Sequence, residues 1–232
     1  MSKFKASGCV RFNKAFQQAR IPAIPIGALL LTATPAFAHH AMGGKMPSNF
    51  FQGFLSGVAH PLIGPDHFAF IVAVGLFAAV KRQGLLIPIA FVLSAMLGTG
   101  AHLAKVNIPG IELFVSGSIL LFGILLAMKN SPTTPLVAGL SAIAGLFHGY
   151  AYGEAIFGAE MTPFLAYLAG FTCIQLVVSL SAFWIGKTVV LNRDTKQQSA
   201  AKFRSAGLVI SGVGLAFFVS QVVAVLLPAS PA

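Results

Sequence analysis

The sequence predicts an all-α polytopic membrane protein with about six transmembrane helices after a cleavable signal peptide. Hydrophobic residues make up 56% of the 232 residues and charged residues only 9%, whereas soluble domains carry about 25% charged residues. The apolar residues gather in runs of about 20, the length that an α-helix needs to cross the hydrocarbon core. Within the first run, residues 60–67 bring polar side chains and helix breakers together, so we expect this helix to be broken there.

Residues 1–38 have the pattern of a secretory signal peptide. Five basic residues precede a short apolar stretch at residues 24–31, and Ala36-Phe37-Ala38 matches the small-x-small sequence at which such signals are cleaved. An uncleaved first helix is the alternative, but the apolar stretch is short and three prolines lie in or near it. We therefore expect cleavage after Ala38.

Residues 39–48 would then form a short exported tail. Cleavage leaves a free α-amine beside the imidazoles of His39 and His40. Neutral imidazole is a good ligand for nickel, cobalt, copper and zinc, so the tail is a candidate chelator. The alternative, a polar tail without a role in binding, is the simpler interpretation.

The rest of the chain, residues 49–232, is expected to form one transmembrane domain. It contains six apolar segments with short connections and no stretch that suits a further soluble domain. The segments cover residues 49–80, 84–104, 111–128, 135–157, 162–186 and 205–227. The sequence leaves the oligomeric state open.

The basic residues indicate how this domain lies in the membrane. The net charge is +10, but the bases lie in the signal peptide and in short loops rather than in a patch, which argues against a nucleic-acid partner. If the mature N-terminus is outside, only Lys45 and Lys105 lie on the outer side. This asymmetry follows the positive-inside rule and predicts a multi-pass protein of the bacterial cytoplasmic (inner) membrane. The bases of the inner loops are Lys81, Arg82, Lys129, Lys187, Arg193, Lys196, Lys202 and Arg204.

The first candidate site lies in the broken segment, where His60, Asp66 and His67 fall within eight residues. An ionisable residue inside a bilayer costs at least a few kcal/mol and usually has a function there. On a continuous helix His60 and His67 would share a face, about 20° apart. Unwinding at Gly64-Pro65 would turn Asp66 towards them. Two imidazoles and a carboxylate suit a borderline divalent cation, and the alternative is a buried polar cluster that only packs helices.

A second polar cluster lies in the fourth segment. His148 and Tyr152 are four residues apart and share a helix face, and Glu154 follows Gly153, where the helix is expected to loosen. A cation site between the first and fourth segments would need both clusters, so His148 and Glu154 are candidates that complete or neighbour the metal site. Tyr152 is a secondary candidate, for which packing near the membrane interface is the simpler interpretation.

Three further residues are secondary candidates at the outer entrance. His102 and Glu112 flank the connection between the second and third segments, and Glu160 follows the fourth. Their side chains could attract cations, although polar residues at such positions are more often merely solvated.

The pattern favours a transporter over an enzyme, with no permanently bound cofactor. The sequence contains no phosphate-binding glycine loop, no Gly-x-Ser-x-Gly motif and no Cys-x-x-Cys pair. Two alternatives stay open. Histidines on facing helices could ligate a b-type haem, for example His60 or His67 with His148, and a His/His/Asp set could hold the zinc of an intramembrane metalloenzyme.

Taken together, these residues resemble the HupE/UreJ family of nickel and cobalt permeases. The resemblance lies in the histidines that follow the signal sequence, in His-x5-Asp-His at residues 60–67, and in His-Gly-x-Ala at residues 148–151. It extends to Gly75 and to residues 166–171, and so covers essentially the mature chain. Many members carry histidine where this chain has Tyr152, and the form Tyr152-Gly153-Glu154 resembles a cyanobacterial-type branch.

The resemblance implies a function as well as a fold. It implies that residues 49–232 are the permease domain of a secondary transporter that takes up Ni²⁺ or Co²⁺ across the cytoplasmic membrane through a His/Asp site. The metal ion is then the substrate, and the lipid bilayer is the other partner. The choice between nickel and cobalt stays open, because tyrosine in place of histidine changes the second cluster. The driving force stays open as well, since the sequence contains no nucleotide-binding motif.

Overall fold

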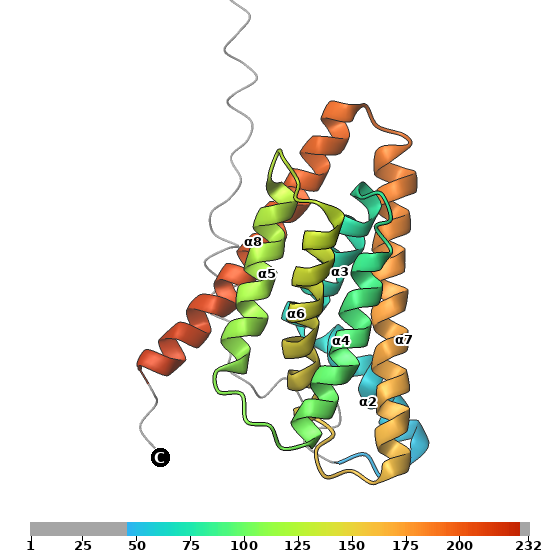
Figure 1. Ribbon diagram of the computed structural model, residues 1–232, viewed down its shortest axis with the longest axis vertical. Helices are drawn as coiled ribbons and strands as arrows, with labels where there is room; N and C mark the ends of the chain where they lie inside the picture. The colour runs from blue at the N-terminus through green and yellow to red at the C-terminus, as the bar shows by residue number, and fades with distance from the viewer. Residues whose placement is uncertain (1–45, 228–232) are drawn as a thin grey trace, which may run out of the picture. The chain divides into compact units, whose positions relative to one another are not determined.

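The computed structural model describes residues 46–227, and this part of the chain contains helices and connections without a β-strand. The signal peptide predicted at residues 1–38 and the histidines His39 and His40 lie outside the described residues. The elements, shown in Figure 1, are α2 (Phe50–Ile63), α3 (Pro65–Val80), α4 (Leu86–Leu103), α5 (Ile111–Ala127), α6 (Thr134–Glu154), α7 (Met161–Ile185), the π-helix η2 (Gly186–Leu191) and α8 (Lys196–Leu226).

Four of these helices, α4, α6, α7 and α8, are long and apolar enough to cross a bilayer, and the bent pair α2–α3 gives a fifth span if its parts are counted together. The remaining predicted span, residues 111–128, corresponds to α5, which has 17 residues. Its length is about 26 Å, less than the ~30 Å of the hydrocarbon core. The helical class is thus confirmed for residues 46–227, while the number of spans by length and composition is four or five rather than six.

The predicted break in the first segment is present as a sharp corner at Gly64. Helix α2 ends at Ile63, α3 begins at Pro65, and the two are bent by 81°. Proline suits the first position of a helix because its missing N–H has no partner there in any case, and it restricts the preceding residue to extended backbone. Gly64 accordingly has φ −76° and ψ 102°. The interruption is confined to Gly64, where the sequence predicted unwinding at Gly64-Pro65, and the residues on either side of it are helical.

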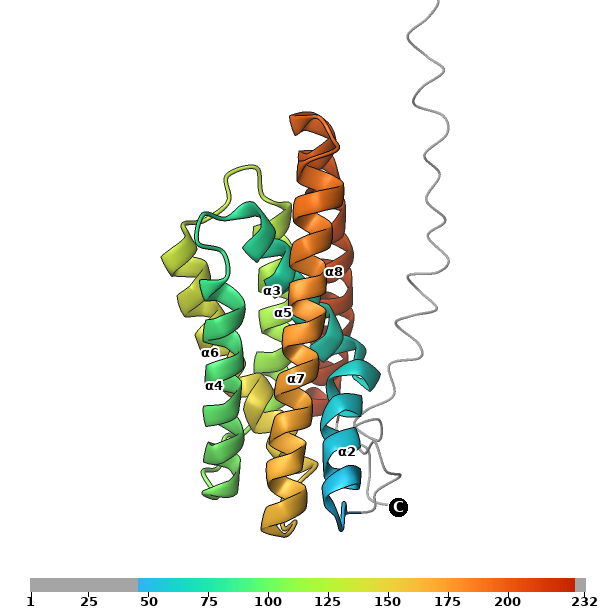
Figure 2. The same ribbon diagram turned by 90° about the vertical axis from the view of Figure 1, so that its right-hand side faces the viewer.

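Close contacts between helices hold this corner inside the bundle. Helix α4 packs on α6, α5 packs on α8, and both α2 and α3 pack on α7, as Figure 2 shows for α2, α3 and α7. Glycines make the approach possible, as expected where helices associate in lipid. A Cβ at Gly149 would overlap the carbonyl oxygen of Ala95 in α4, and a Cβ at Gly75 would overlap the carbonyl oxygen of Ser179 in α7.

Helix α3 has neighbours on several sides, since it contacts α4, α5, α7 and α8. Its Phe70 ring lies 5.1 Å from that of Phe91 and 4.7 Å from that of Phe122, and Phe77 lies 5.6 Å from Phe122. All four rings are buried. The first turn of α3, which carries Asp66 and His67, is therefore fixed in the interior by the apolar packing of the turns that follow it.

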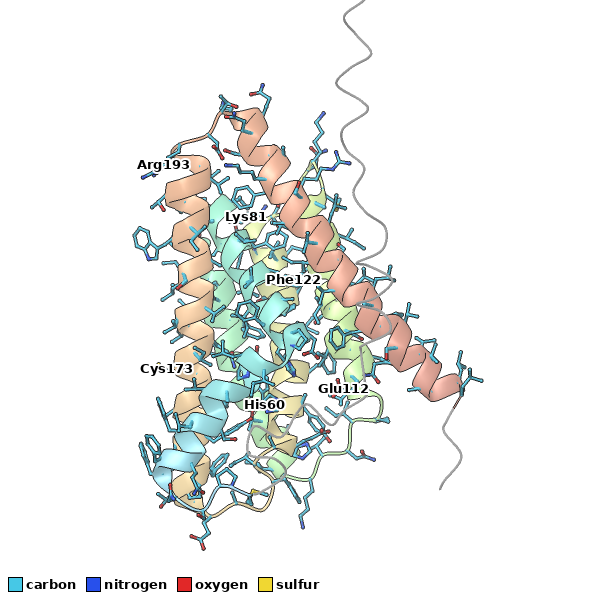
Figure 3. The ribbon with its side chains drawn as sticks, turned by 180° about the vertical axis from the view of Figure 1, so that it is seen from behind. His60, Lys81, Glu112, Phe122, Cys173 and Arg193 are labelled. Atoms are coloured by element: carbon cyan, nitrogen blue, oxygen red, sulfur yellow. The ribbon has the colours of Figure 1, made fainter. Side chains whose placement is uncertain are left out.

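The end of the bundle that carries Lys81 and Arg193 lies opposite the end near His60 and Glu112 (Figure 3). The ammonium group of Lys81 donates a hydrogen bond to the carbonyl oxygen of Pro132, and partial burial lowers the pKa of Lys81. Lys202 forms a 2.8 Å ion pair with Asp194. These contacts tie together the connections that the charge pattern places on one side of the membrane.

Candidate metal-binding site

His60 and His67 lie on either side of the corner, His60 in the last turn of α2 and His67 in the first turn of α3. Their ring centroids are 5.6 Å apart, and both residues are buried, as is Asp66. The sequence argument placed the two rings together on a continuous helix. The structure brings them together differently, because a bend of 81° between the helices directs both side chains into the bundle.

The two polar clusters meet in the structure. His67 Nδ1 and His148 Nδ1 are 2.9 Å apart, a hydrogen-bond distance, and their ring centroids are 5.0 Å apart. His148 is fully buried in α6, and its ring also lies 4.4 Å from that of Phe70. The close packing of α4 on α6 holds this helix in position. The first and fourth apolar segments thus contribute to one site.

Tyr152 lies one turn beyond His148 and faces the same site. Its ring centroid is 5.1 Å from that of His60 and 4.6 Å from that of His67. The residue is fully buried and packs with Tyr167 and Phe171 in an apolar cluster, which agrees with the packing role that the sequence favoured for it. Its hydroxyl oxygen is buried without a hydrogen-bond partner among residues 46–227. A buried polar atom of this kind commonly marks a bound water or ion.

Asp66 is held by its own helix. Its Oδ1 accepts a 2.8 Å hydrogen bond from the backbone N–H of His67, and the first turn of a helix favours a negative charge because of the helix dipole. A Cβ at Gly64 would lie 2.9 Å from this oxygen and 3.0 Å from Cδ2 of His67. The missing side chain of Gly64 therefore leaves space beside both groups.

Two residues of the site were not foreseen from the sequence. Ser118 in α5 lies with Oγ 3.0 Å from His148 Nε2, and Tyr167 in α7 lies with Oη 3.3 Å from His60 Nδ1. Tyr167 Oη also donates a 2.9 Å hydrogen bond to the Tyr152 carbonyl oxygen. The sequence around Ser118 gave no signal, since serines are common in transmembrane helices. Tyr167 lies in the stretch 166–171 that carried part of the family resemblance.

The remaining candidates are placed elsewhere on the chain's helices. Glu154 is the last residue of α6, and both it and Glu160 are exposed. His102, near the end of α4, packs with its ring 4.6 Å from Tyr150 and 5.5 Å from Phe157. Glu112 is partly buried in the first turn of α5. Within residues 46–227, no three His, Cys, Asp or Glu side chains form a ready-made metal cage.

Comparison with known proteins identifies the family. The family model described as HupE / UreJ protein matches residues 27–217. The chain belongs to the HupE/UreJ family. A similar relative is "Protein HupE" of Rhizobium leguminosarum bv. viciae, which is 27% identical over 189 residues, covering 81% of this chain and 94% of the relative. No solved structure matches the chain.

Membership of the HupE/UreJ family confirms the resemblance read from the motifs. The match spans the broken helix pair, the second cluster in α6 and residues 166–171. The same stretch of chain therefore carries both the family signature and the buried histidines that the fold assembles around the α2–α3 corner.

Proposed function

We propose that this HupE/UreJ chain is a permease that takes up Ni²⁺ or Co²⁺ across the cytoplasmic membrane, with the mature N-terminus outside. His60, Asp66 and His67 bind the ion in transit. His148 and Glu154 are the further candidates, and Tyr152 faces the same space. The ion is a substrate rather than a cofactor, and the site is a binding step on a path rather than a catalytic centre.

The observation that supports this proposal best is the meeting of the two histidine clusters inside the membrane domain. His67 and His148 are 2.9 Å apart, the His60 ring is 5.6 Å from that of His67, and all three are buried. Polar and ionisable groups are retained at membrane depth chiefly where they serve an ion pathway. An incomplete donor set also suits transport, since a conducted ion must leave its site as well as enter it.

The haem alternative that uses His67 with His148 is disfavoured by the same contact. A bis-histidine haem lies between its two axial rings, but His67 and His148 are in direct hydrogen-bond contact, which leaves no room for a porphyrin between them. A Soret band in the purified protein would support haem binding. The zinc-enzyme alternative predicts one zinc ion per chain that survives dialysis, and metal analysis of the dialysed protein tests it.

The proposal is tested by the accumulation of radiolabelled nickel and cobalt in cells that lack their own uptake systems. The wild-type chain is expected to accumulate one or both metals, and Asp66→Asn is expected to abolish accumulation at matched membrane expression. The amide keeps the shape of the carboxylate but removes the negative charge that balances the cation.

Asp194→Asn is the matched control. Asp194 lies in the connection between η2 and α8 and forms an ion pair with Lys202, and a pair of this kind near the protein surface contributes at most about 1 kcal/mol. Its variant should transport normally. Glu154→Gln then shows whether this exposed carboxylate takes part. Absence of accumulation by correctly inserted wild-type protein would contradict the proposal.

A further inference from the structure

A chain of hydrogen bonds leads from a backbone carbonyl to His67 through two side chains. Ser118 Oγ lies 2.7 Å from the carbonyl oxygen of Val115 and 3.0 Å from His148 Nε2. A serine hydroxyl has one hydrogen, and a carbonyl oxygen can only accept. The hydrogen of Ser118 is therefore donated to Val115, and its oxygen accepts the hydrogen carried by His148 Nε2.

The donor and acceptor in these two contacts also determine which nitrogen of His67 carries the hydrogen. A neutral imidazole carries a hydrogen on only one nitrogen, so His148 with a hydrogen on Nε2 has a bare Nδ1. In the 2.9 Å contact between the two Nδ1 atoms, His67 must then be the donor. Its Nε2 is left with the lone pair, which is what a metal ligand requires, and a second partner on the other nitrogen is how ligand histidines are usually oriented.

His60 has a similar connection on the α7 side. Tyr167 Oη lies 2.9 Å from the carbonyl oxygen of Tyr152 and 3.3 Å from His60 Nδ1. The phenol hydrogen is donated to the carbonyl, so the phenol oxygen accepts from His60 Nδ1–H. His60 Nε2 is then also the nitrogen with the lone pair. Two separate series of hydrogen bonds, each ending on a backbone carbonyl oxygen, give the two histidines the same tautomer.

The Nε2 side of the His67 ring and the Asp66 carboxylate lie together at the corner between α2 and α3. Cδ2 of His67, the carbon bonded to Nε2, borders the space at Gly64, where a Cβ would lie 3.0 Å away. Asp66 Oδ1 borders the same space at 2.9 Å. The lone pair of His67 and the carboxylate of Asp66 therefore lie at the same corner, and the ring centroid of His60 is 5.6 Å from that of His67.

We infer that His60 and His67 bind the transported ion through Nε2, in tautomers that hydroxyl groups of neighbouring helices fix. Ser118 acts through His148, and Tyr167 acts directly on His60. His148 is thereby a positioning residue rather than a metal ligand. This inference rests on the proposed function for the identity of the ion, but the tautomers can be measured without any metal.

The first experiment reads the tautomers of the metal-free protein by ¹⁵N NMR. The chain has six histidines, so ¹⁵N-histidine labelling gives few ring signals, and single His→Gln variants assign them. At about pH 8, where imidazole is ordinarily neutral, we expect a bare Nε2 in His60 and His67 and a protonated Nε2 in His148. A bare Nε2 in His148 would overturn the inference.

The second experiment compares nickel affinity of purified Ser118→Ala and Ser116→Ala by equilibrium dialysis. Ser116 is on the same helix and donates a similar 2.7 Å bond to its own backbone, at Glu112, so it controls for the loss of a serine hydroxyl. Loss of a partner of a ligand histidine typically weakens metal binding about 10- to 100-fold. We expect this loss in Ser118→Ala, recovery in Ser118→Thr, and wild-type affinity in Ser116→Ala. Unchanged affinity in Ser118→Ala would count against the inference.

The third comparison separates a positioning role of His148 from ligation. The amide oxygen in His148→Gln can still accept the hydrogen of His67 Nδ1, whereas His148→Ala offers no acceptor. We expect the Gln variant to bind nickel about tenfold more tightly than the Ala variant. Equal and large losses in both would identify His148 as a ligand and overturn its assignment.

These results also distinguish the inference from the proposed function. If the wild-type protein binds no nickel or cobalt, the proposed function fails, and the ion-binding part of the inference fails with it, whatever the tautomers are. If the protein binds and transports the metal but the tautomers differ from those expected, the inference fails alone.

Discussion

At the scale of single residues, the hydroxyl of Tyr152 is buried beside two histidines and has no hydrogen-bond partner among residues 46–227. Tyr167 differs, because its hydroxyl contacts both a carbonyl oxygen and His60. Leaving a buried polar group unsatisfied costs about 1–3 kcal/mol, whereas a satisfied one contributes about 1 kcal/mol. The two tyrosines therefore allow a matched comparison.

We predict that Tyr152→Phe does not lower thermal stability in detergent and stabilises the metal-free protein by about 1 kcal/mol, while it weakens metal uptake. Tyr167→Phe should lose roughly 1 kcal/mol, because it breaks two contacts. Thermal unfolding measures the stability of both variants, and accumulation of radiolabelled metal measures their uptake. Destabilisation by Tyr152→Phe as large as that by Tyr167→Phe would show that the hydroxyl has a partner.

Gln175 in α7 is a second buried polar residue without a partner. Its side chain is fully buried, and neither its amide nitrogen nor its amide oxygen has a hydrogen-bond partner among residues 46–227. Gln175→Leu keeps a similar volume and removes the unsatisfied groups, so we predict a gain of about 1–3 kcal/mol in stability. Gln221→Leu, at a partly exposed position of α8, should change stability by less than about 0.5 kcal/mol. A loss of stability in Gln175→Leu would indicate ordered water bound to the amide.

At the scale of elements, the corner between α2 and α3 depends on a small residue next to proline. The Gly64 backbone is in a region that alanine also adopts, so an added Cβ acts through space rather than through the backbone. It would lie 2.9 Å from Asp66 Oδ1 and 3.0 Å from Cδ2 of His67. Both distances are shorter than ordinary van der Waals contacts, so one of these side chains must move.

We therefore predict that Gly64→Ala remains folded and inserted but transports metal poorly. Gly139→Ala is the matched control, since a Cβ at this exposed position in α6 would meet nothing within 4 Å. It should be stabilised by up to about 1 kcal/mol through the better helix propensity of alanine and should transport normally. Uptake by both variants together with thermal unfolding tests this, and normal transport by Gly64→Ala would show that the ligand positions tolerate the added methyl group.

At the scale of the whole molecule, the connections near Lys81 and Arg193 gather basic residues at one end of the bundle (Figure 3). The positive-inside rule predicts that this end faces the cytoplasm. Asn107, in the connection between α4 and α5 at the other end of the bundle, is exposed. Arg193 at the basic end is exposed as well. Both positions are therefore suitable for labelling from the aqueous phase.

We predict that a membrane-impermeant maleimide labels Asn107→Cys in intact spheroplasts and labels Arg193→Cys only after permeabilisation. The background must lack Cys9 and the exposed Cys173, which are the two cysteines of the chain. Labelling of Arg193→Cys in intact spheroplasts, with Asn107→Cys protected, would reverse the orientation. Uptake through the site would then have to start from the end that carries Lys81.

The helical membrane class and the position of the break could be predicted from the sequence alone. Apolar runs and a Gly-Pro pair are local features, and their consequences for backbone conformation need no distant contact. The motifs at residues 60–67 and 148–151 also identified the buried polar residues, and the family match supports the resemblance that they carried. The predicted count of six spans was not confirmed, because α5 has only 17 residues.

Which of these side chains meet depends on how the helices pack, and local sequence patterns do not contain that information. His67 and His148 are 81 residues apart in the chain, and their contact depends on how α3 and α6 pack. Ser118 and Tyr167 enter the site because α5 and α7 present those turns to it, whereas Glu154 is left exposed at the end of α6. Helix periodicity states which residues share a face. It does not state which face of another helix lies opposite, and the hydrogen bond that each imidazole nitrogen makes depends on that packing.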